Sequence, residues 1–216
     1  MGLAAAALPA CFALFGLDGY GPPDSIDASA TSDASADADA SADASSARRT
    51  VFVTSTTFAG DLGGAAGGDT KCRAAATDAG LRGTFRAWLS DGPTGGHVRV
   101  VAGSGALELP NGVVVAANAT ELSMTGPRRA IAVDERGRPA IGAGGGCDDG
   151  GLAVWTGTIE DGGALSPPVD CTRWSARTSP PRVAGIAGIA GRTGSGWTAA
   201  CVRACDAPAA LYCIEQ

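Results

Sequence analysis

The number and placement of the cysteines constrain this chain more than any other feature. Six of the seven cysteines lie between residues 72 and 213, and only Cys11 lies apart from them. An even number of cysteines is typical of a disulfide-bonded domain in an oxidising compartment. A metal site is the alternative, but the chain has no Cys-x-x-Cys pair and His97 is its only histidine. Because zinc-ligand spacing is missing, the sequence favours disulfides and predicts neither a metal nor a cofactor.

The composition divides the chain near residue 47. Between residues 24 and 47, every residue except Ile26 and Thr31 is Ala, Ser or Asp. Such a segment has too little apolar surface to offset the entropy lost on ordering. We therefore expect a signal region over residues 1–20, a disordered linker over 21–47 and one domain over 48–216. This last segment is long enough to bury a single core.

The formal net charge of −6 comes from the N-terminal part of the chain. Seven of the 22 acidic residues lie before residue 48, whereas all 16 basic residues lie after it. The domain therefore has a net charge of about +1, which gives no reason to expect a nucleic-acid partner.

The N-terminus carries features of an export signal. Residues 3–17 form an apolar stretch that is too short to span a bilayer comfortably. Within it, the sequence Leu-Pro-Ala-Cys, which ends at Cys11, is similar to a bacterial lipobox. This similarity favours a lipid on Cys11. The alternative is an ordinary signal peptide that is cut after Cys11. Signal peptides begin with a positively charged segment, but no Lys or Arg precedes Arg48. One explanation is that the true start of the protein lies upstream of Met1. Both alternatives predict export. If Cys11 carries a lipid, we expect that lipid to be the only contact with a membrane.

Periodicity within the domain predicts an α+β fold. We expect a helix that is capped by Asp69, runs to Ala79 and stops at Gly80, with Cys72 facing inward. A helical turn is expected at 121–124, and 162–197 reads mostly as loop. The pattern thus predicts two short helices, long loops and many short antiparallel strands. The expected strands span residues 51–58, 85–89, 98–101, 113–117, 152–158 and 211–215.

Three segments carry a resemblance to a known family. They are GGDTKCRAAATDAGLRGTFRAWLSD at 67–91, VWTGTIEDGGALSPPVDCTRW at 154–174 and ACDAPAALYCIEQ at 204–216. In these segments the domain resembles collagen-derived endostatin, which has a C-type-lectin-like fold. The lipobox and the low-complexity spacer make the whole chain similar to the bacterial endostatin-like surface lipoproteins.

The resemblance implies specific pairings and core positions. Two family disulfides would correspond to Cys72–Cys213 and Cys171–Cys205. Cys147 and Cys201 depart from the family core and are paired by parity alone. The resemblance further implies that three tryptophans belong to the core, namely Trp88, Trp155 and Trp174.

The resemblance also implies a non-enzymatic recognition or adhesion module at the bacterial cell surface, anchored in the outer membrane by its lipid. Its ligand would be an extracellular protein or glycan, since related bacterial proteins are associated with matrix and complement-regulator binding. We expect contacts through the loops at 118–151 and 179–197. The alternative is a structural cell-envelope lipoprotein without a soluble ligand.

Related folds bind calcium or heparin, and the residues of this chain bear on both activities. Calcium-dependent lectins use Glu-Pro-Asn-like and Trp-Asn-Asp-like motifs, and both are absent from this chain. Heparin binding by endostatin suggests the densest basic group as a possible site; the alternative is that these arginines are isolated and solvated. The group consists of Arg128, Arg129, Arg136 and Arg138.

An enzyme is the opposing class of function. His97 is the only imidazole, and no catalytic motif surrounds it. A thiol-redox enzyme acting through Cys201 and Cys205 is the least favoured hypothesis, because three residues separate these cysteines instead of two.

Overall fold

The computed structural model describes residues 48–100, 103–140, 147, 150–178 and 183–216. Cys11 and the predicted linker lie outside these ranges. Within them the fold is α+β, with four α-helices, one 3-10 helix and a mixed sheet of eight strands. In chain order the elements are β1 (Arg49–Val53), α1 (Gly64–Asp78), β2 (Phe85–Ala87), α2 (Gly96–Arg99), β3 (Leu107–Glu108), β4 (Val114–Ala116), α3 (Ala119–Thr125), β5 (Ala153–Trp155), α4 (Cys171–Trp174), β6 (Ala184–Ile189), η1 (Gly194–Trp197), β7 (Cys201–Ala204) and β8 (Ala210–Glu215).

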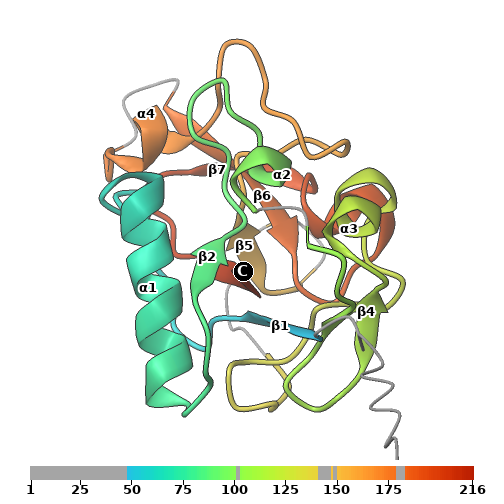
Figure 1. The fold of residues 1–216 in the computed structure, drawn as a ribbon. Helices are drawn as coiled ribbons and strands as arrows, with labels where there is room; N and C mark the ends of the chain where they lie inside the picture. Colours follow the sequence, from blue (N-terminus) through green and yellow to red (C-terminus); the bar gives the residue numbers. More distant parts are fainter. Residues whose placement is uncertain (1–47, 101–102, 141–146, 148–149, 179–182) are drawn as a thin grey trace, which may run out of the picture. The chain divides into compact units, whose positions relative to one another are not determined.

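The last strand lies at the centre of the sheet, whose order is β4-β3-β1-β8-β5-β6-β7 (Figure 1). β8 pairs with β1 in antiparallel fashion along one side. On its other side, it pairs first with β5 in parallel and then with β2 in antiparallel fashion. β1 also pairs with β3 in parallel. The sheet is therefore mixed: the expected antiparallel pairs are present, and two parallel pairs accompany them.

Alternation along the central strands creates two cores. Successive side chains of a strand point to opposite faces; thus Val51 and Val53 of β1 pack in one cluster and Phe52 packs in the other. In β8, Tyr212 and Ile214 join the first cluster. The second cluster contains Cys72, Cys171, Cys205 and Cys213. Helix α1 covers it with Ala65 and Ala76. Trp88, Trp155 and Trp174 are buried as expected, and Trp197 is buried with them.

The long helix begins earlier than the sequence pattern predicts. α1 starts at Gly64 in a glycine-rich segment that reads as a turn, and Asp69 lies inside the helix. Because of this position, Asp69 is not the N-cap. Its carboxylate instead accepts a hydrogen bond from the backbone N–H of Ala87 and pairs with Arg99. Gly67 permits this path, since an added Cβ would lie 2.1 Å from the Leu62 carbonyl oxygen.

Three further expectations were wrong. Residues 96–99 form α2, and Val98 is exposed, so no strand begins there. The segment 162–197 was expected to be mostly loop, yet it contains α4, β6 and η1. The described part of the domain thus contains four α-helices, where two were expected. β6 has the sequence AGIAGI, in which glycine and alanine conceal the usual strand pattern.

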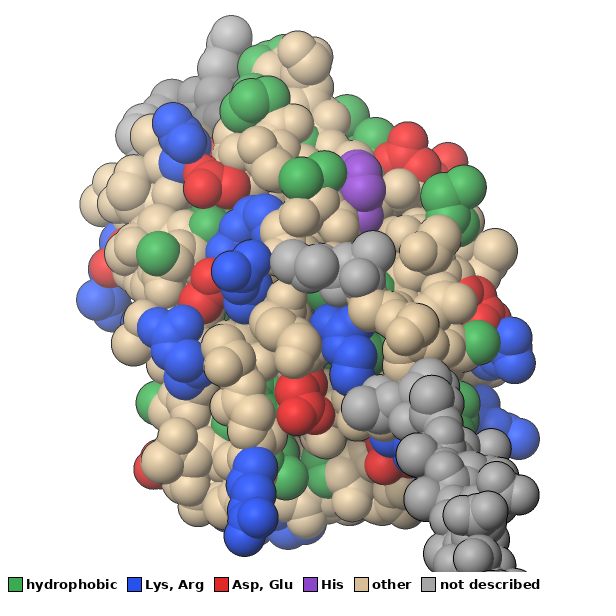
Figure 2. All heavy atoms as spheres, viewed as in Figure 1, with side chains coloured by type: hydrophobic (Ala, Val, Ile, Leu, Met, Phe, Trp, Pro, Cys, Tyr) green, Lys and Arg blue, Asp and Glu red, His purple; other side chains and the backbone are tan. Residues whose placement is uncertain are grey.

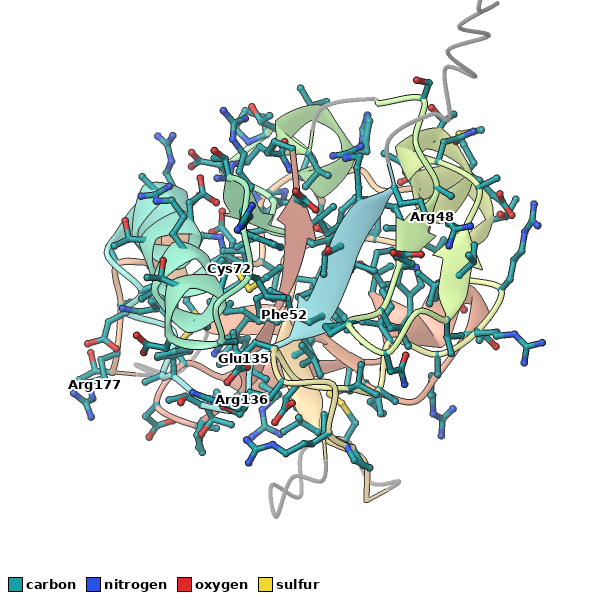
Figure 3. The ribbon with its side chains drawn as sticks, turned by 60° about the horizontal axis from the view of Figure 1, so that its bottom comes forward. Arg48, Phe52, Cys72, Glu135, Arg136 and Arg177 are labelled. Carbon is teal, nitrogen blue, oxygen red and sulfur yellow. A yellow bond between two sulfur atoms is a disulfide. The ribbon has the colours of Figure 1, made fainter. Side chains whose placement is uncertain are left out.

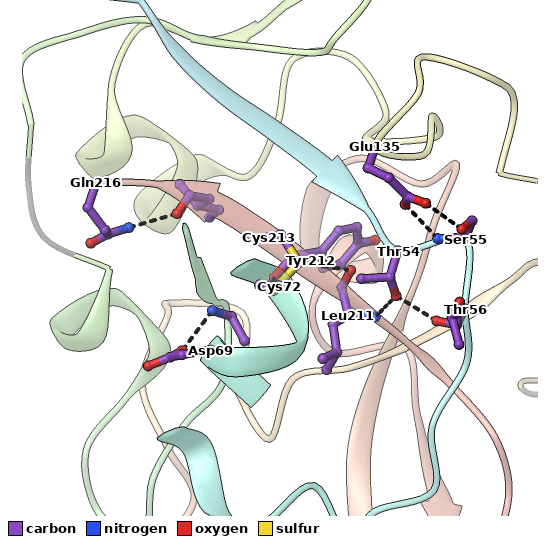
Figure 4. The surroundings of a disulfide bond; sticks show 12 residues. Thr54, Ser55, Thr56, Asp69, Cys72, Glu135, Leu211, Tyr212, Cys213 and Gln216 are labelled. Carbon is purple, nitrogen blue, oxygen red and sulfur yellow. Dashed lines mark hydrogen bonds between the residues drawn. A yellow bond between two sulfur atoms is a disulfide. The ribbon is translucent and has the colours of Figure 1, made fainter. Parts of the chain in front are cut away.

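Three disulfides connect the described elements. Cys72 of α1 is bonded to Cys213 of β8, which fixes the helix to the centre of the sheet (Figure 4). The other pairs are Cys171–Cys205 and Cys147–Cys201. All three agree with the expected pairs. No helix within the described ranges is long and apolar enough to cross a membrane.

Candidate functional site

The cysteines considered for redox chemistry belong to separate disulfides. Cys201 is bonded to Cys147, and Cys205 is bonded to Cys171. A dithiol oxidoreductase exchanges a disulfide between its own neighbouring cysteines. In the described structure Cys201 and Cys205 do not form that pair, so each cysteine holds a different part of the chain in place.

The only histidine contacts a neighbouring turn. His97 lies in α2, where its Nδ1 is 2.7 Å from the Gly162 carbonyl oxygen and its backbone N–H donates to the same oxygen. This contact joins α2 to the turn at 159–163. The side chain is otherwise exposed, as Figure 2 shows by the purple atoms at the surface. Its observed role is to hold two surface segments together.

The four candidate arginines do not form a uniformly basic surface. Arg128 pairs with Glu121 of α3, Arg136 pairs with Glu135, and Arg138 pairs with Asp134. Arg129 is exposed. Hydrogen bonding by the Arg128 guanidinium holds the pKa of Glu121 below its usual value. Because three of the four cations have an acidic partner, their attraction for a polyanion is partly cancelled.

Basic side chains are also dispersed on the face that Figure 2 shows, where blue and red atoms alternate. On the described surface, Arg99 pairs with Asp69, and Arg173 pairs with Asp91. This mixed pattern is consistent with the near-neutral charge of the domain and is not typical of a polyanion-binding face.

One cavity lies between α3, the turn at 159–163 and η1. We call it the α3 cavity, and its volume is about 320 Å³. Three segments that are far apart in sequence supply its walls. The lining residues are Met124, Thr125, Gly126, Glu160, Asp161, Gly194 and Ser195. The two carboxylates are the only ionisable side chains among them, so the cavity is negatively charged.

An unpaired indole lies beneath this cavity. Trp197 is buried, and its Nε1–H has no hydrogen-bond acceptor among the described residues. Gly126, which lines the cavity, covers that edge of the ring: a Cβ added at Gly126 would lie 3.2 Å from Nε1. Only a glycine fits here without displacing the indole, and its positive φ of 75° also suits glycine.

One exposed apolar side chain, Met124, lines the α3 cavity. Met124 is 70% exposed, and Val98, on the neighbouring helix α2, is 60% exposed. Leu165, which follows the turn at 159–163, is also exposed. Met124 is therefore the large apolar side chain that the cavity lining offers to a ligand.

A second cavity lies beside α1, and we call it the α1 cavity. Its volume is about 260 Å³. The helix forms one wall, the segment after β1 forms the second, and the turn containing Glu135 and Arg136 forms the third (Figure 3). The lining residues are Thr54, Ser55, Thr56, Phe58, Lys71, Ala74, Ala75, Asp78, Glu135 and Arg136.

Glu135 holds two walls of the α1 cavity together. Its side chain is only 3% exposed, and its carboxylate accepts hydrogen bonds from the backbone N–H and the hydroxyl of Ser55 (Figure 4). Arg136 donates to the same carboxylate at 2.7 Å. The charge of Glu135 is therefore balanced inside the cavity wall.

No group of three or more potential metal ligands is found among the described His, Cys, Asp and Glu side chains. Glu160 and Asp161 lie together at the α3 cavity, but Ca²⁺ requires six to eight oxygen ligands. The donor set seen there does not meet that requirement.

Sequence reasoning named Arg136 but missed most residues of both cavities. Met124 and Gly126 lie within the predicted contact loop 118–151, and Gly194 lies within 179–197. However, Ala119–Thr125 is helical and Ala184–Ile189 is a buried strand, so these ranges are not continuous contact loops. An available signal was Asn118, a favourable N-cap residue three positions before Glu121, which marks the start of the short helix that carries Met124.

No protein-family model matches the chain, and no curated protein matches it. The functional assignment therefore rests on the geometry above and on the sequence motifs.

Proposed function

We propose that this chain is an exported, lipid-anchored surface protein whose domain recognises an extracellular protein without catalysing a reaction. We further propose that residues 48–216 adopt an endostatin-like, C-type-lectin-like fold. This proposal is supported by the pairing of β1 with β8 and by the Cys72–Cys213 link between α1 and β8. These contacts bring the two ends of the domain together.

One observation carries the functional proposal: the exposed Met124 lines a negatively charged cavity on a disulfide-bonded framework, and Val98 is exposed on α2, which contacts α3. Met124 and Val98 would lose contact with water on binding, which favours association. Methionine suits this purpose because its flexible thioether adapts to different partner surfaces. The Cys171–Cys205 and Cys147–Cys201 bonds restrict the domain framework that carries this surface.

The charge of the α3 cavity identifies the partner's chemistry. Glu160 and Asp161 would attract a cation, while Met124 would contact an aliphatic stem. A lysine or arginine side chain has both properties. The proposed partner is therefore a protein that presents a basic residue next to an apolar patch, with the basic residue entering the α3 cavity.

The absence of catalysis is supported by the described polar groups. His97 contacts a backbone carbonyl oxygen and is not next to a serine or cysteine nucleophile in the described contacts. The six described cysteines are in disulfides. An active site requires a base placed next to its nucleophile.

Surface plasmon resonance of the full chain against purified matrix proteins, envelope proteins and glycans tests this function. Saturable binding to a protein is expected, and Met124→Ser should weaken it about tenfold or more. The matched control is Val202→Ser on β7, because Val202 is 63% exposed but does not line the cavity. Equal losses in both variants would argue against the α3 cavity, and silence across the three classes would favour a structural envelope role.

The lipid anchor has its own test. Mass spectrometry of the native protein should find a diacylglyceryl group on an N-terminal Cys11, and Cys11→Ser should release the protein from the membrane fraction. A mature N-terminus after Cys11, without lipid, would indicate plain secretion instead.

A further inference from the structure

We propose that the α1 cavity is a second binding site, which holds one neutral saccharide residue. This site is separate from the α3 cavity and does not depend on the function proposed for that surface. The proposal rests on the size of the cavity, on its rigid walls and on the mixture of hydrogen-bond donors and acceptors that line it.

The size of the α1 cavity favours a small ligand. Its volume of about 260 Å³ falls just below the usual range of about 300–1,000 Å³ for sites that enclose drug-sized molecules. A single pyranose ring at the end or side of a glycan chain suits a cavity of this size, because the rest of the glycan can remain in solvent.

The walls of this cavity are fixed before a ligand arrives. The helix wall is bonded to the sheet through Cys72, which directly follows Lys71. The second wall is held by Thr54, whose hydroxyl donates to the Thr56 carbonyl oxygen and accepts from the Leu211 backbone N–H. Glu135 joins this wall to the third. A preformed site loses little conformational entropy on binding.

The lining offers unused donors and acceptors. The Lys71 ammonium lies 5.2 Å from the centre of the Phe58 ring, and its N–H groups make no hydrogen bond with the described residues. Arg136 uses one N–H group for Glu135 and retains others. Asp78 makes neither an ion pair nor a hydrogen bond within the described structure, so its carboxylate is available as an acceptor.

This combination suits hydroxyl groups, because each hydroxyl both donates and accepts a hydrogen bond. Lys71 and Arg136 can donate to ligand oxygens, while Asp78 accepts from a ligand hydroxyl. The four ionised side chains sum to zero charge, since Glu135 balances Arg136 and Asp78 balances Lys71. A polyanion would gain no net attraction here, whereas a neutral polyhydroxylated ring would find a partner for several of its groups.

The probes for this site are the methyl glycosides of glucose, galactose, mannose and N-acetylglucosamine. Saturation-transfer NMR with the full chain should detect at least one of them, with a dissociation constant of about millimolar. Lys71→Met and Asp78→Ala should each weaken that binding about tenfold or more, because each removes a charged hydrogen-bonding group. Binding should persist in about 0.5 M sodium chloride, which screens charge attraction.

Arg73→Met is the matched control, because Arg73 lies on the same helix but does not line the cavity. It removes one positive charge, as Lys71→Met does, and should leave glycoside binding unchanged. Circular dichroism of each variant checks that the fold is retained. The proposal is overturned if no glycoside binds, if Lys71→Met or Asp78→Ala binds like the wild type, or if salt abolishes the binding.

Discussion

The rings of Trp88 and Trp197 pack with their centroids 4.9 Å apart, yet only Trp88 has an acceptor for its indole N–H. Trp88 Nε1 donates to the Thr198 hydroxyl at 2.9 Å. Trp197 Nε1 has no acceptor among the described residues, and neither does the buried Tyr212 hydroxyl, whose ring lies 5.4 Å from that of Trp197. Burial raises the pKa of the Tyr212 phenol. Two adjacent tryptophans thus have the same packing but different polar surroundings.

This difference predicts unequal effects of the same substitution. Trp88→Phe should lower the free energy of unfolding by about 1–2 kcal/mol more than Trp197→Phe. Both changes remove similar buried volume, but only the first breaks a hydrogen bond, while the second also removes an unsatisfied donor. Urea unfolding of the two variants measures the difference. Equal losses would mean that Trp197 Nε1 has a hydrogen-bond partner in solution.

The disulfides should differ in their contribution to stability. Cys72–Cys213 closes a loop with a sequence separation of 141, compared with 54 for Cys147–Cys201. On chain entropy alone these bonds are worth about 5 and about 4 kcal/mol, respectively. Cys72 and Cys213 are also fully buried. The double variant Cys72→Ala/Cys213→Ala should therefore be the less stable of the two alanine pairs in guanidinium unfolding; the reverse order would contradict this account.

Asp134 should make stability depend on acid pH. Burial alone would raise the pKa of this carboxyl, but hydrogen bonds from Arg138 and the Arg136 backbone outweigh that effect and lower the pKa. A lowered pKa contributes stability above the unfolded value of about 3.9, and this contribution is lost as the pH falls toward the folded value. Asp134→Asn should lower the melting temperature at pH 7. The difference in melting temperature between this variant and the wild type should become smaller below about pH 4. A gap independent of pH would exclude this mechanism.

Gly188 of β6 should not tolerate a side chain. A Cβ added there would lie 1.8 Å from the Trp197 carbonyl oxygen, so β6 or η1 would have to move. Gly188→Ala should lower the free energy of unfolding by about 3 kcal/mol or more. Gly112→Ala is the control, because Gly112 has open space around it and should cost only about 1 kcal/mol through its positive φ. Similar losses in thermal unfolding would show that close packing at Gly188 is not the cause.

The sequence was most informative where a pattern is local. Helical spacing placed Cys72 on the inner face of α1, and the β-branched and aromatic residues around Phe52 and Tyr212 predicted β1 and β8. It was least informative in the Gly- and Ala-rich segment 184–189. Small residues give no strong period, and the buried path of β6 depends on the contacts between Gly188 and Trp197 and between Gly185 and Trp155.

The sequence by itself therefore determined an α+β domain with paired cysteines and a near-neutral charge, because these follow from composition and short-range periodicity; the buried tryptophans were implied by the resemblance alone. Only the tertiary structure decided where its cavities lie. Met124, Glu160 and Gly194 meet at the α3 cavity, and Ser55, Lys71 and Glu135 meet at the α1 cavity, although each set is dispersed along the chain. These residues lie close together only because the sheet and the disulfides place distant segments side by side. No local sequence pattern encodes that placement.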